Sequence, residues 1–176
     1  MWRLPSDTRG TLSDPDGIDV RALIAHKAQG GSVIDFPKGR KLAVEAVVDV
    51  ACDIWIPAAR PDVVREDNAG RVRAKLMLQG ANIPCTPGAE NMLHERGVLV
   101  VPDFIANAGG VICTAMEYRG ATESAAFDTI AEKIRANTEA VLSEAKAKNM
   151  LPRQVAVELA MRRVREAMAY RRFGIM

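Results

Sequence analysis

The sequence predicts an α/β fold in which a parallel sheet is followed by a C-terminal third made only of helices. Three observations lead to this prediction. Three short runs are apolar without strict alternation, helical patterns with recognisable ends lie between and around them, and only helical spacing is found after Gly110. A strand, helix, strand rhythm of this kind implies right-handed crossovers between parallel strands.

Each apolar run has the length of one short strand. The runs cover residues 53–56, 74–78 and 98–101. Strands that are covered on both faces give near-continuous apolar runs, whereas a half-exposed strand alternates. We therefore expect all three runs in one buried parallel sheet.

Two helices are predicted from the signals at their ends. Asp19 can cap the first turn of one helix, which Gly30 then terminates. Thr86 and Pro87 supply a capping hydroxyl and a first-turn proline to a second helix, which Gly97 closes. The second of these helices would connect the last two strands.

The C-terminal region, about residues 120–176, is predicted to be helical. Apolar residues keep helical spacing up to Asn149, and Pro152 begins another helix. No linker or repeat divides the chain, so its 176 residues fit one domain.

Composition excludes several classes of function. Twenty-four basic and 22 acidic residues give a formal charge of +2, which provides no electrostatic case for binding nucleic acid or an anionic membrane. No stretch approaches the roughly 18 apolar residues of a membrane span. The three cysteines form no CxxC pair, and neither His26 nor His94 has a ligand partner at zinc spacing, so we predict no metal. We expect a soluble, cytoplasmic protein.

Small residues and asparagines follow all three predicted strands. In an open parallel sheet, ligands bind at the carboxyl ends of the strands, where these segments would meet. Small residues let a flat ligand approach the backbone, and an asparagine amide can donate and accept hydrogen bonds at once. Any one segment alone is more simply explained as a turn, but three such segments at the ends of successive strands indicate a nucleotide-binding site. The segments are Pro57-Ala58-Ala59, Gly80-Ala81-Asn82 and Asn107-Ala108-Gly109-Gly110.

Longer motifs resemble a known family. "SDTRGTLSDPDGIDVRALIAHK", "CDIWIPAA" and "KLMLQGANIPCTPGAENMLHERGVLVVPDFIANAGGV" are similar, in order and spacing, to the coenzyme domain of the glutamate/leucine/phenylalanine/valine dehydrogenases. The resemblance extends over nearly the whole chain and is weakest after Tyr118. It implies NAD- or NADP-dependent oxidative deamination of an amino acid, most simply L-glutamate, to a 2-oxo acid and ammonia.

The resemblance also implies roles for five residues at the coenzyme. Ala58 and Ala59 would line its path, Asn82 would bond the nicotinamide-side ribose, and Asn107 would orient the nicotinamide end. Asp7 would lie beside the adenine ribose, where an acidic side chain accepts from ribose hydroxyls and repels a 2′-phosphate. This favours NAD, although NADP is possible because Ser6 or Arg9 could face a phosphate and Asp7 could be only a turn residue.

Two residues after the double glycine would contact the amino-acid substrate. Val111 would form part of the wall of the substrate site. Thr114 stands where members specific for glutamate typically have a serine, and a hydroxyl there favours glutamate. Threonine also packs as a small β-branched residue, so a leucine or branched-chain specificity stays open.

Parts of the family pattern are missing from the sequence. It contains no GxGxxG turn and begins at what resembles the second strand, so the resemblance implies an incomplete Rossmann-type sheet that lacks its first, central strand. We expect Met1 to Leu4, or a second copy of the chain in a homo-oligomer, to fill the gap, because unpaired strand edges are disfavoured. No lysine or aspartate lies in a matching catalytic motif, so no catalytic residue is predicted. The alternative to an enzyme part is a non-catalytic nucleotide-binding or assembly module.

Overall fold

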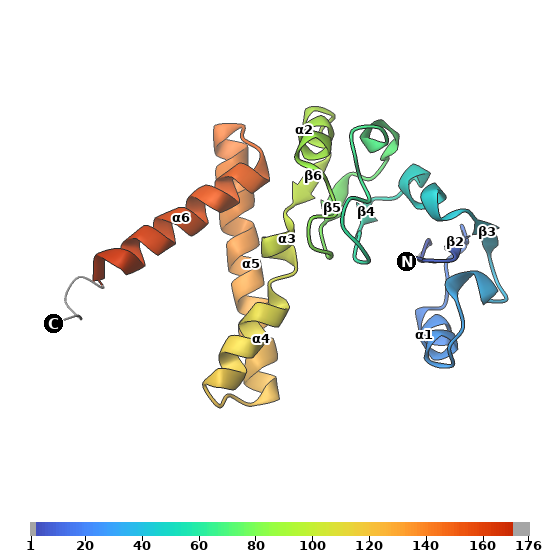
Figure 1. Ribbon diagram of the computed structural model, residues 1–176, viewed down its shortest axis with the longest axis horizontal. Coiled ribbons are helices and arrows are strands. Elements are labelled where there is room, and N and C mark those ends of the chain that lie inside the picture. Colours follow the sequence, from blue (N-terminus) through green and yellow to red (C-terminus); the bar gives the residue numbers. More distant parts are fainter. Residues whose placement is uncertain (1–2, 171–176) are drawn as a thin grey trace.

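The computed structural model describes residues 3–170, arranged along one long axis. Figure 1 shows an antiparallel sheet with its helix at the N-terminal end, a parallel sheet in the middle, and a group of helices at the C-terminal end. Helix α6 extends away from this group, with its C-terminal end at the far tip of the molecule. Within residues 3–170, no helix combines the length and apolar character needed to cross a membrane.

The predicted parallel sheet is confirmed. Its strands are β4 (Ile54–Trp55), β5 (Leu76–Leu78) and β6 (Leu99–Val101), in the order β4-β5-β6. Both pairs are parallel, and Met77 lies opposite Trp55 on one side and Val100 on the other. The strands are shorter than the apolar runs, because each run begins one or two residues before its strand.

The two predicted connecting helices form with the predicted caps. α1 (Val20–Ala28) begins at Asp19, whose side chain accepts from the backbone N–H groups of Arg21 and Ala22. α2 (Pro87–Glu95) begins at Thr86, whose hydroxyl accepts from Ala89 N–H. Gly30 and Gly97 follow these helices with positive φ, the conformation that glycine adopts most readily at a helix end.

The C-terminal third is helical, as predicted. After β6 come the short α3 (Asp103–Ala106), then α4 (Gly109–Tyr118), α5 (Glu123–Lys148) and α6 (Pro152–Tyr170). α5 ends at Asn149 in the left-handed region, with φ of 51°. α4 lies along the first half of α5, and the start of α6 packs against its second half (Figure 1). The predicted helical region continues to residue 176, but residues 171–176 lie outside the described residues.

The N-terminal part forms a second, antiparallel sheet that the sequence analysis does not predict. β1 (Ser6–Asp7), β2 (Gly10–Ser13) and β3 (Arg40–Leu42) pair in the order β1-β2-β3. Short 3-10 helices η1 (Val33–Asp35), η2 (Val44–Asp49) and η3 (Ala69–Arg71) lie in the connections. A Cβ at Gly10, the first residue of β2, would come within 2.5 Å of Ile34 Cγ2 and 2.9 Å of Leu42 O, so the close approach of η1 and β3 requires glycine there.

The start of the chain runs along this antiparallel sheet. Arg3 and Pro5 accept backbone hydrogen bonds, of 3.0 Å each, from Asp14 and Leu12 at β2. Met1 and Trp2, part of the segment expected to fill the gap, lie outside the described residues. Among the described residues, β4 pairs only with β5, so it is the edge strand on the side where a further strand was expected.

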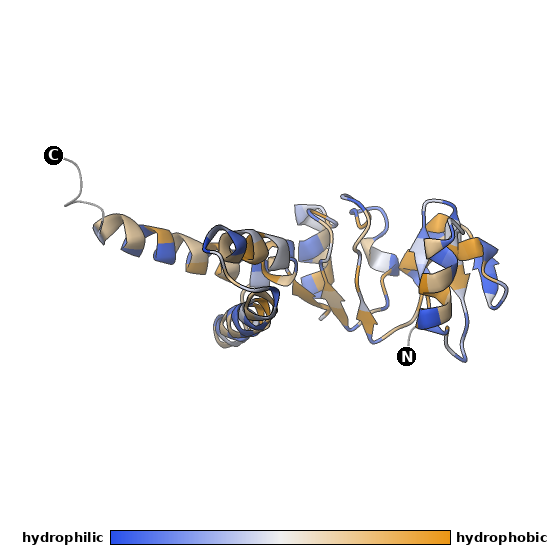
Figure 2. Ribbon diagram, turned by 90° about the horizontal axis from the view of Figure 1, so that it is seen from below, coloured by the Kyte–Doolittle hydropathy of each residue, from blue (hydrophilic) through white to orange (hydrophobic). Residues whose placement is uncertain are grey.

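Each face of the parallel sheet has its own apolar core. On one face, Met77 and Val100 pack with Leu93 of α2. On the other, Val101 packs with Val141 of α5 and Val155 of α6. Figure 2 shows the strands as a hydrophobic centre between more polar helices. The sheet is therefore held from both sides, and its carboxyl edge carries the loops where the ligand site is predicted.

Candidate functional site

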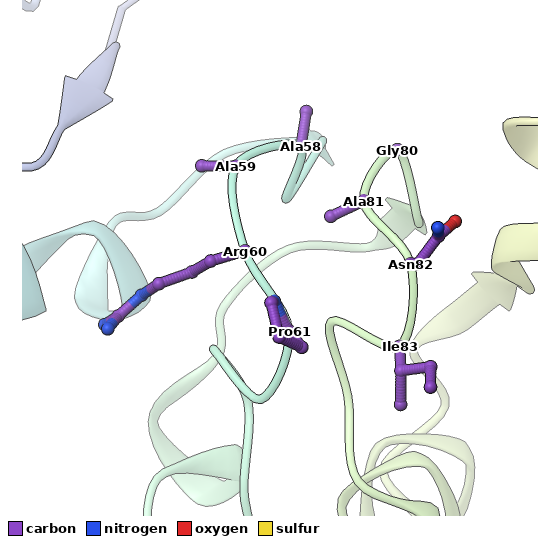
Figure 3. A pocket seen from close by; sticks show the side chains of 8 residues that line it. All are labelled: Ala58, Ala59, Arg60, Pro61, Gly80, Ala81, Asn82 and Ile83. Atoms are coloured by element: carbon purple, nitrogen blue, oxygen red, sulfur yellow. The ribbon is translucent and has the colours of Figure 1, made fainter.

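A cavity of about 500 Å³ lies between the loop after β4 and the loop after β5. Figure 3 shows the two loops facing each other across it. It contains three of the predicted site residues, Ala58, Ala59 and Asn82. Its walls are mostly small side chains and backbone, which suits a flat ligand. The lining residues are Ala58, Ala59, Arg60, Pro61, Gly80, Ala81, Asn82 and Ile83.

The predicted Asn107 is brought to the same edge by α3. It lies just after this helix, and its backbone N–H donates to Asp103 O. Its side-chain Nδ2 donates to Asn82 Oδ1 at 2.7 Å and to Gly80 O at 3.4 Å. Two asparagines that lie 25 residues apart in the sequence thus form one hydrogen-bonded pair at the rim of the cavity.

The two cavity loops are packed tightly against each other. Ala81 N–H donates to Pro57 O at 2.9 Å, which joins the loops directly. A Cβ at Gly80 would lie 3.0 Å from Ala58 Cβ and 3.3 Å from Ile56 Cγ2. Only glycine fits at position 80 without moving the neighbouring loop, so the small residues here serve packing as well as access.

A buried polar network lies beneath the cavity loops. Gln79 and Glu90 are 0% and 2% exposed, and Gln79 Nε2 donates to Glu90 Oε1 at 2.5 Å. Arg153, at the start of α6, donates to Glu90 Oε2 at 2.6 Å, to Gln79 Oε1 at 2.8 Å and to Asp103 Oδ1 at 2.9 Å. Within residues 3–170, no buried side-chain nitrogen or oxygen atom lacks a partner. The network joins β5, α2, α3 and α6.

Asp103 connects this network to the cavity. Its Oδ2 accepts from Ile83 N–H at 2.9 Å, next to Asn82. Ile83 has φ of 50°, a left-handed conformation that is rare for a β-branched residue and has to be held by its surroundings. Burial raises the pKa of Asp103, but the Ile83 N–H and the Arg153 guanidinium outweigh it and lower the pKa overall. The ionised carboxylate therefore fixes the loop that presents Asn82.

Sequence reasoning missed the network, although a signal existed. Gln79 follows a buried strand directly, and Glu90 stands three residues before Leu93 on the buried side of α2. An acidic residue at an apolar helix position indicates a buried partner. That partner, Arg153, lies 63 residues away, so the pairing was not visible in the sequence.

The double glycine leaves open space at the start of α4. A Cβ at Gly109 would meet Ile130 Cγ2 only at an ordinary 3.5 Å, and a Cβ at Gly110 would meet nothing within 4 Å. Packing within the chain therefore explains why residue 80 is glycine, but it does not explain why residue 110 is glycine.

The predicted substrate residues lie further along α4 and outside the cavity. Val111 is 78% exposed. Thr114 is also exposed, and its hydroxyl donates to Gly110 O at 3.1 Å, so it bonds its own helix. The structure places both one to two turns beyond the asparagine pair, without a contact to it.

Asp7 lies in β1 of the antiparallel sheet, away from the cavity loops. Its carboxylate accepts from Val33 N–H at 2.8 Å, from Ser32 Oγ and Lys27 Nζ at 2.9 Å, and from Arg9 N–H at 3.0 Å. Burial raises the pKa of Asp7, but these donors together lower it well below its usual range. A ribose hydroxyl at Asp7 would compete with donors that are already in place.

A second hollow, of about 610 Å³, lies on the other side of Gly80. Its walls are mainly apolar, with Ile56 and Leu78 of the sheet region facing Ile134 and Thr138 of α5. It was not predicted from the sequence. Ile56 is 48% exposed, so this part of the sheet face has no cover within residues 3–170.

Comparison with known proteins gives one consistent family. A family model described as Glutamate/Leucine/Phenylalanine/Valine dehydrogenase matches residues 5–172. A glutamate dehydrogenase of Aeropyrum pernix is 36% identical over 177 residues, and an NADP(+)-dependent glutamate dehydrogenase of Pyrobaculum calidifontis is 39% identical over 180 residues. Each match covers 94% of this chain and 42% of the relative.

A solved structure agrees with these matches. The hetero-hexameric glutamate dehydrogenase of Thermus thermophilus, in its leucine-bound form, superposes with a TM-score of 0.81 at 25% identity. The superposition covers 99% of this chain and 42% of that one. The chain therefore spans less than half the length of the relatives that it matches.

Proposed function

Because this chain belongs to the glutamate/leucine/phenylalanine/valine dehydrogenase family, we propose that it supplies the coenzyme-binding part of an amino-acid dehydrogenase. The reaction is the NAD(P)-dependent oxidative deamination of L-glutamate to 2-oxoglutarate and ammonia. The parallel sheet is, in this proposal, one half of a Rossmann-type sheet.

The observation that carries the proposal is the asparagine pair beside the small-residue cavity. Asn82 and Asn107 come from two different loops and meet at 2.7 Å at the carboxyl edge of the parallel sheet. That edge is where α/β proteins of this kind bind nucleotides. The pair offers amide groups to a ligand, and Ala58 and Ala59 leave room for one.

The residues present fit a nicotinamide nucleotide. The bound coenzyme supplies the hydride acceptor for oxidation of the amino acid. Asn82 holds the ribose on the nicotinamide side, Asn107 orients the nicotinamide end, and Ala58 and Ala59 line the path of the coenzyme. The open backbone at Gly110 lets the ring and the substrate approach each other.

Asp7 is proposed to favour NAD over NADP. Its ionised carboxylate repels a 2′-phosphate, and its lowered pKa keeps that charge across the physiological range. Lys27 and Arg9, which lie beside it, could instead attract the phosphate of NADP. The Pyrobaculum relative is NADP(+)-dependent, so both coenzymes belong in the test.

L-glutamate is the proposed substrate, with Val111 and Thr114 on the wall of its site. The Thr114 hydroxyl would turn from Gly110 O to the distal carboxylate of glutamate. A leucine or branched-chain specificity is the alternative, in which Thr114 only packs against an apolar side chain.

The chain on its own is proposed to be inactive. It spans 42% of its relatives, it holds no residue in a matching catalytic motif, and an apolar hollow beside Gly80 is left open. A non-catalytic nucleotide-binding module is the second candidate, favoured by that same incompleteness.

A chimera tests the proposal. In it, this chain replaces the matching stretch of the Aeropyrum pernix glutamate dehydrogenase. We expect glutamate-dependent reduction of NAD, with weaker reduction of NADP, and no activity from the chain alone. The Asn107→Ala chimera should bind the coenzyme more weakly. Its KM for the coenzyme should rise about tenfold, because one or two neutral hydrogen bonds are lost.

The matched control is Asn68→Ala, an asparagine outside the cavity whose side chain bonds Val63 O and Arg65 N–H. It should leave the KM for coenzyme unchanged. An intact, folded chimera that oxidises leucine but not glutamate would support the alternative substrate. A folded chimera that binds neither coenzyme would overturn the proposal.

A further inference from the structure

Two residues in the cavity loops adopt a backbone conformation that glycine normally takes. Asp62, in the loop after β4, has φ of 52°, and Ile83, in the loop after β5, has φ of 50°. A Cβ disfavours this left-handed conformation about tenfold or more, and a β-branched side chain makes it rarer still. Surrounding contacts therefore have to hold Ile83 in this conformation.

Hydrogen bonds, and not apolar packing, hold Ile83. Its side chain is 58% exposed, and Figure 3 shows it and the Asn82 side chain pointing in different directions. Both backbone groups of Ile83 are bound. Its N–H donates to Asp103 Oδ2, and its carbonyl oxygen accepts from Asp62 N–H, both at 2.9 Å.

Asp103 is an acceptor whose own position is fixed. Its side chain is 10% exposed, and its second oxygen, Oδ1, accepts from Arg153 Nη2 at 2.9 Å. Its backbone N–H donates to Gln79 Oε1 at 3.0 Å. The carboxylate cannot turn away from Ile83 without breaking a charge-assisted bond to Arg153.

The conformation of Ile83 determines where Asn82 lies. Ala81 N–H donates to the loop after β4 at 2.9 Å, and Pro84 O accepts from the same loop at 2.9 Å. Only Asn82 and Ile83 lie between these two anchors, so a change of φ at Ile83 has to be absorbed by Asn82. Such a change would separate Asn82 Oδ1 from Asn107 Nδ2, which now lie 2.7 Å apart.

We propose that Asp103 is a positioning residue for the coenzyme site. By holding Ile83 in the left-handed conformation, it keeps Asn82 paired with Asn107 and so sets the affinity for the nicotinamide side of the coenzyme. Asp103 does not contact the ligand, because it acts through Ile83. The identity of the ligand rests on the proposed function, whereas the hold on Asn82 does not.

Asp103→Asn is the first test. Both neighbours of the carboxylate, Ile83 N–H and Arg153, are donors, so the new amide places an N–H group against one of them. The dissociation constant of the full chain for NAD should rise about tenfold, to about 10 mM, in a titration followed by amide chemical shifts. Without NAD, the side-chain amide signals of Asn107 should shift, because its bond to Asn82 is lost.

Ile83→Gly shows whether Asp103 acts through Ile83. Glycine adopts the left-handed conformation readily, so it needs less help from the carboxylate. Beside Ile83→Gly, the Asp103→Asn change should weaken NAD binding only about threefold instead of tenfold. Asn149→Gly replaces another left-handed residue, at the end of α5, and is the matched control that should rescue nothing. A merely structural role for Asp103 would produce no difference between the two glycine variants.

Two further variants separate positioning from folding. Glu90→Gln alters the same buried network, but Glu90 bonds only Gln79 and Arg153, so it should lower the thermal midpoint and change NAD affinity less than about twofold. Ile83→Pro fixes φ near about −65° and leaves Arg153 its carboxylates. It should weaken NAD binding about tenfold, also where Asp103→Asn does not fold.

The outcomes distinguish this proposal from the proposed function. NAD binding by the original chain that is equally strong in Asp103→Asn or in Ile83→Pro would overturn the positioning role and leave the proposed function standing. Rescue by Ile83→Gly that is no greater than by Asn149→Gly would also overturn it. An original chain that does not bind NAD would overturn both, and unchanged Asn107 side-chain signals in folded Asp103→Asn would refute the hold on Asn82 in either case.

Discussion

Two groups of polar residues at the same sheet edge have opposite surroundings. Gln79, Glu90 and Asp103 are buried and have their hydrogen bonds completed by Arg153. Asn82 is exposed, and its side-chain oxygen accepts a hydrogen bond from Asn107 at the rim of the cavity. The two groups are close in the sequence at two points, because Gln79 precedes Asn82 by three residues and Asp103 precedes Asn107 by four.

This difference in burial suggests different roles, in which the buried group supports the loops and the exposed pair is available to a ligand. The network of Gln79, Glu90, Asp103 and Arg153 holds the loops, and its loss should lower stability. The asparagine pair is expected to contribute little to folding, and in the proposed function its amide groups bind the coenzyme, so its loss should lower binding. Four substitutions can break or sharpen this comparison.

The largest effect on stability is expected from Arg153→Met. It leaves the carboxylates of Glu90 and Asp103 buried without their cation, which costs about 3 kcal/mol of unfolding free energy. Urea unfolding followed by circular dichroism measures this loss. Arg162→Met, which removes only an exposed ion pair with Glu144, should cost less than about 1 kcal/mol. Equal losses in both variants would contradict a special role for the network.

Asp7→Asn should cost about 2 kcal/mol at neutral pH, because the carboxylate accepts from several donors, Lys27 among them. The pKa of Asp7 is lower in the folded chain than in the unfolded chain, where it is about 3.9. Its stabilisation is therefore complete above about pH 4 and is lost as the pH falls towards the folded pKa. The gap between the two unfolding curves should shrink below about pH 4. A gap that is constant between pH 2 and 7 would show that the carboxylate charge is not responsible.

Gly80→Ala should cost about 1 to 2 kcal/mol, because the added methyl group meets Ala58 Cβ at 3.0 Å. The double variant Gly80→Ala with Ala58→Gly removes the opposing methyl group and should recover most of the loss. Thermal unfolding measures both. Gly110→Ala, which meets nothing within 4 Å, should leave the midpoint unchanged or raise it slightly.

The smallest effect on stability is expected from Asn107→Ala. Its hydrogen bonds lie at an exposed or half-buried rim, so the unfolding free energy should change by less than about 1 kcal/mol. Coenzyme binding should nevertheless weaken. A loss of stability as large as that of Arg153→Met would place Asn107 among the supporting residues.

Local signals in the sequence predicted the elements with clear ends. Asp19 and Thr86 cap their helices as expected, and the three apolar runs form the parallel sheet. These predictions succeeded because caps and buried strands depend on neighbouring residues. The loops after those strands also gather Ala58, Asn82 and Asn107 at one edge.

Long-range contacts could not be predicted in this way. The antiparallel sheet joins β2 to β3 across more than 25 residues, and no local pattern specifies that pairing. Arg153 is a surface-type residue by sequence, and only the fold brings it to Glu90. Asp7 was assigned to a ligand by resemblance, whereas its four internal donors also give it a supporting role.

Titration of the full chain with NAD, followed by backbone amide chemical shifts, tests the central claim most directly. The account predicts weak binding, with a dissociation constant of about 1 mM, because the sequence contains no glycine-rich turn for the pyrophosphate. The shifts should cluster at Ala58, Ala59, Asn82 and Asn107, while the amides of the antiparallel sheet beyond Asp7 change little. Shifts confined to another surface, or none at about 10 mM NAD, would contradict it.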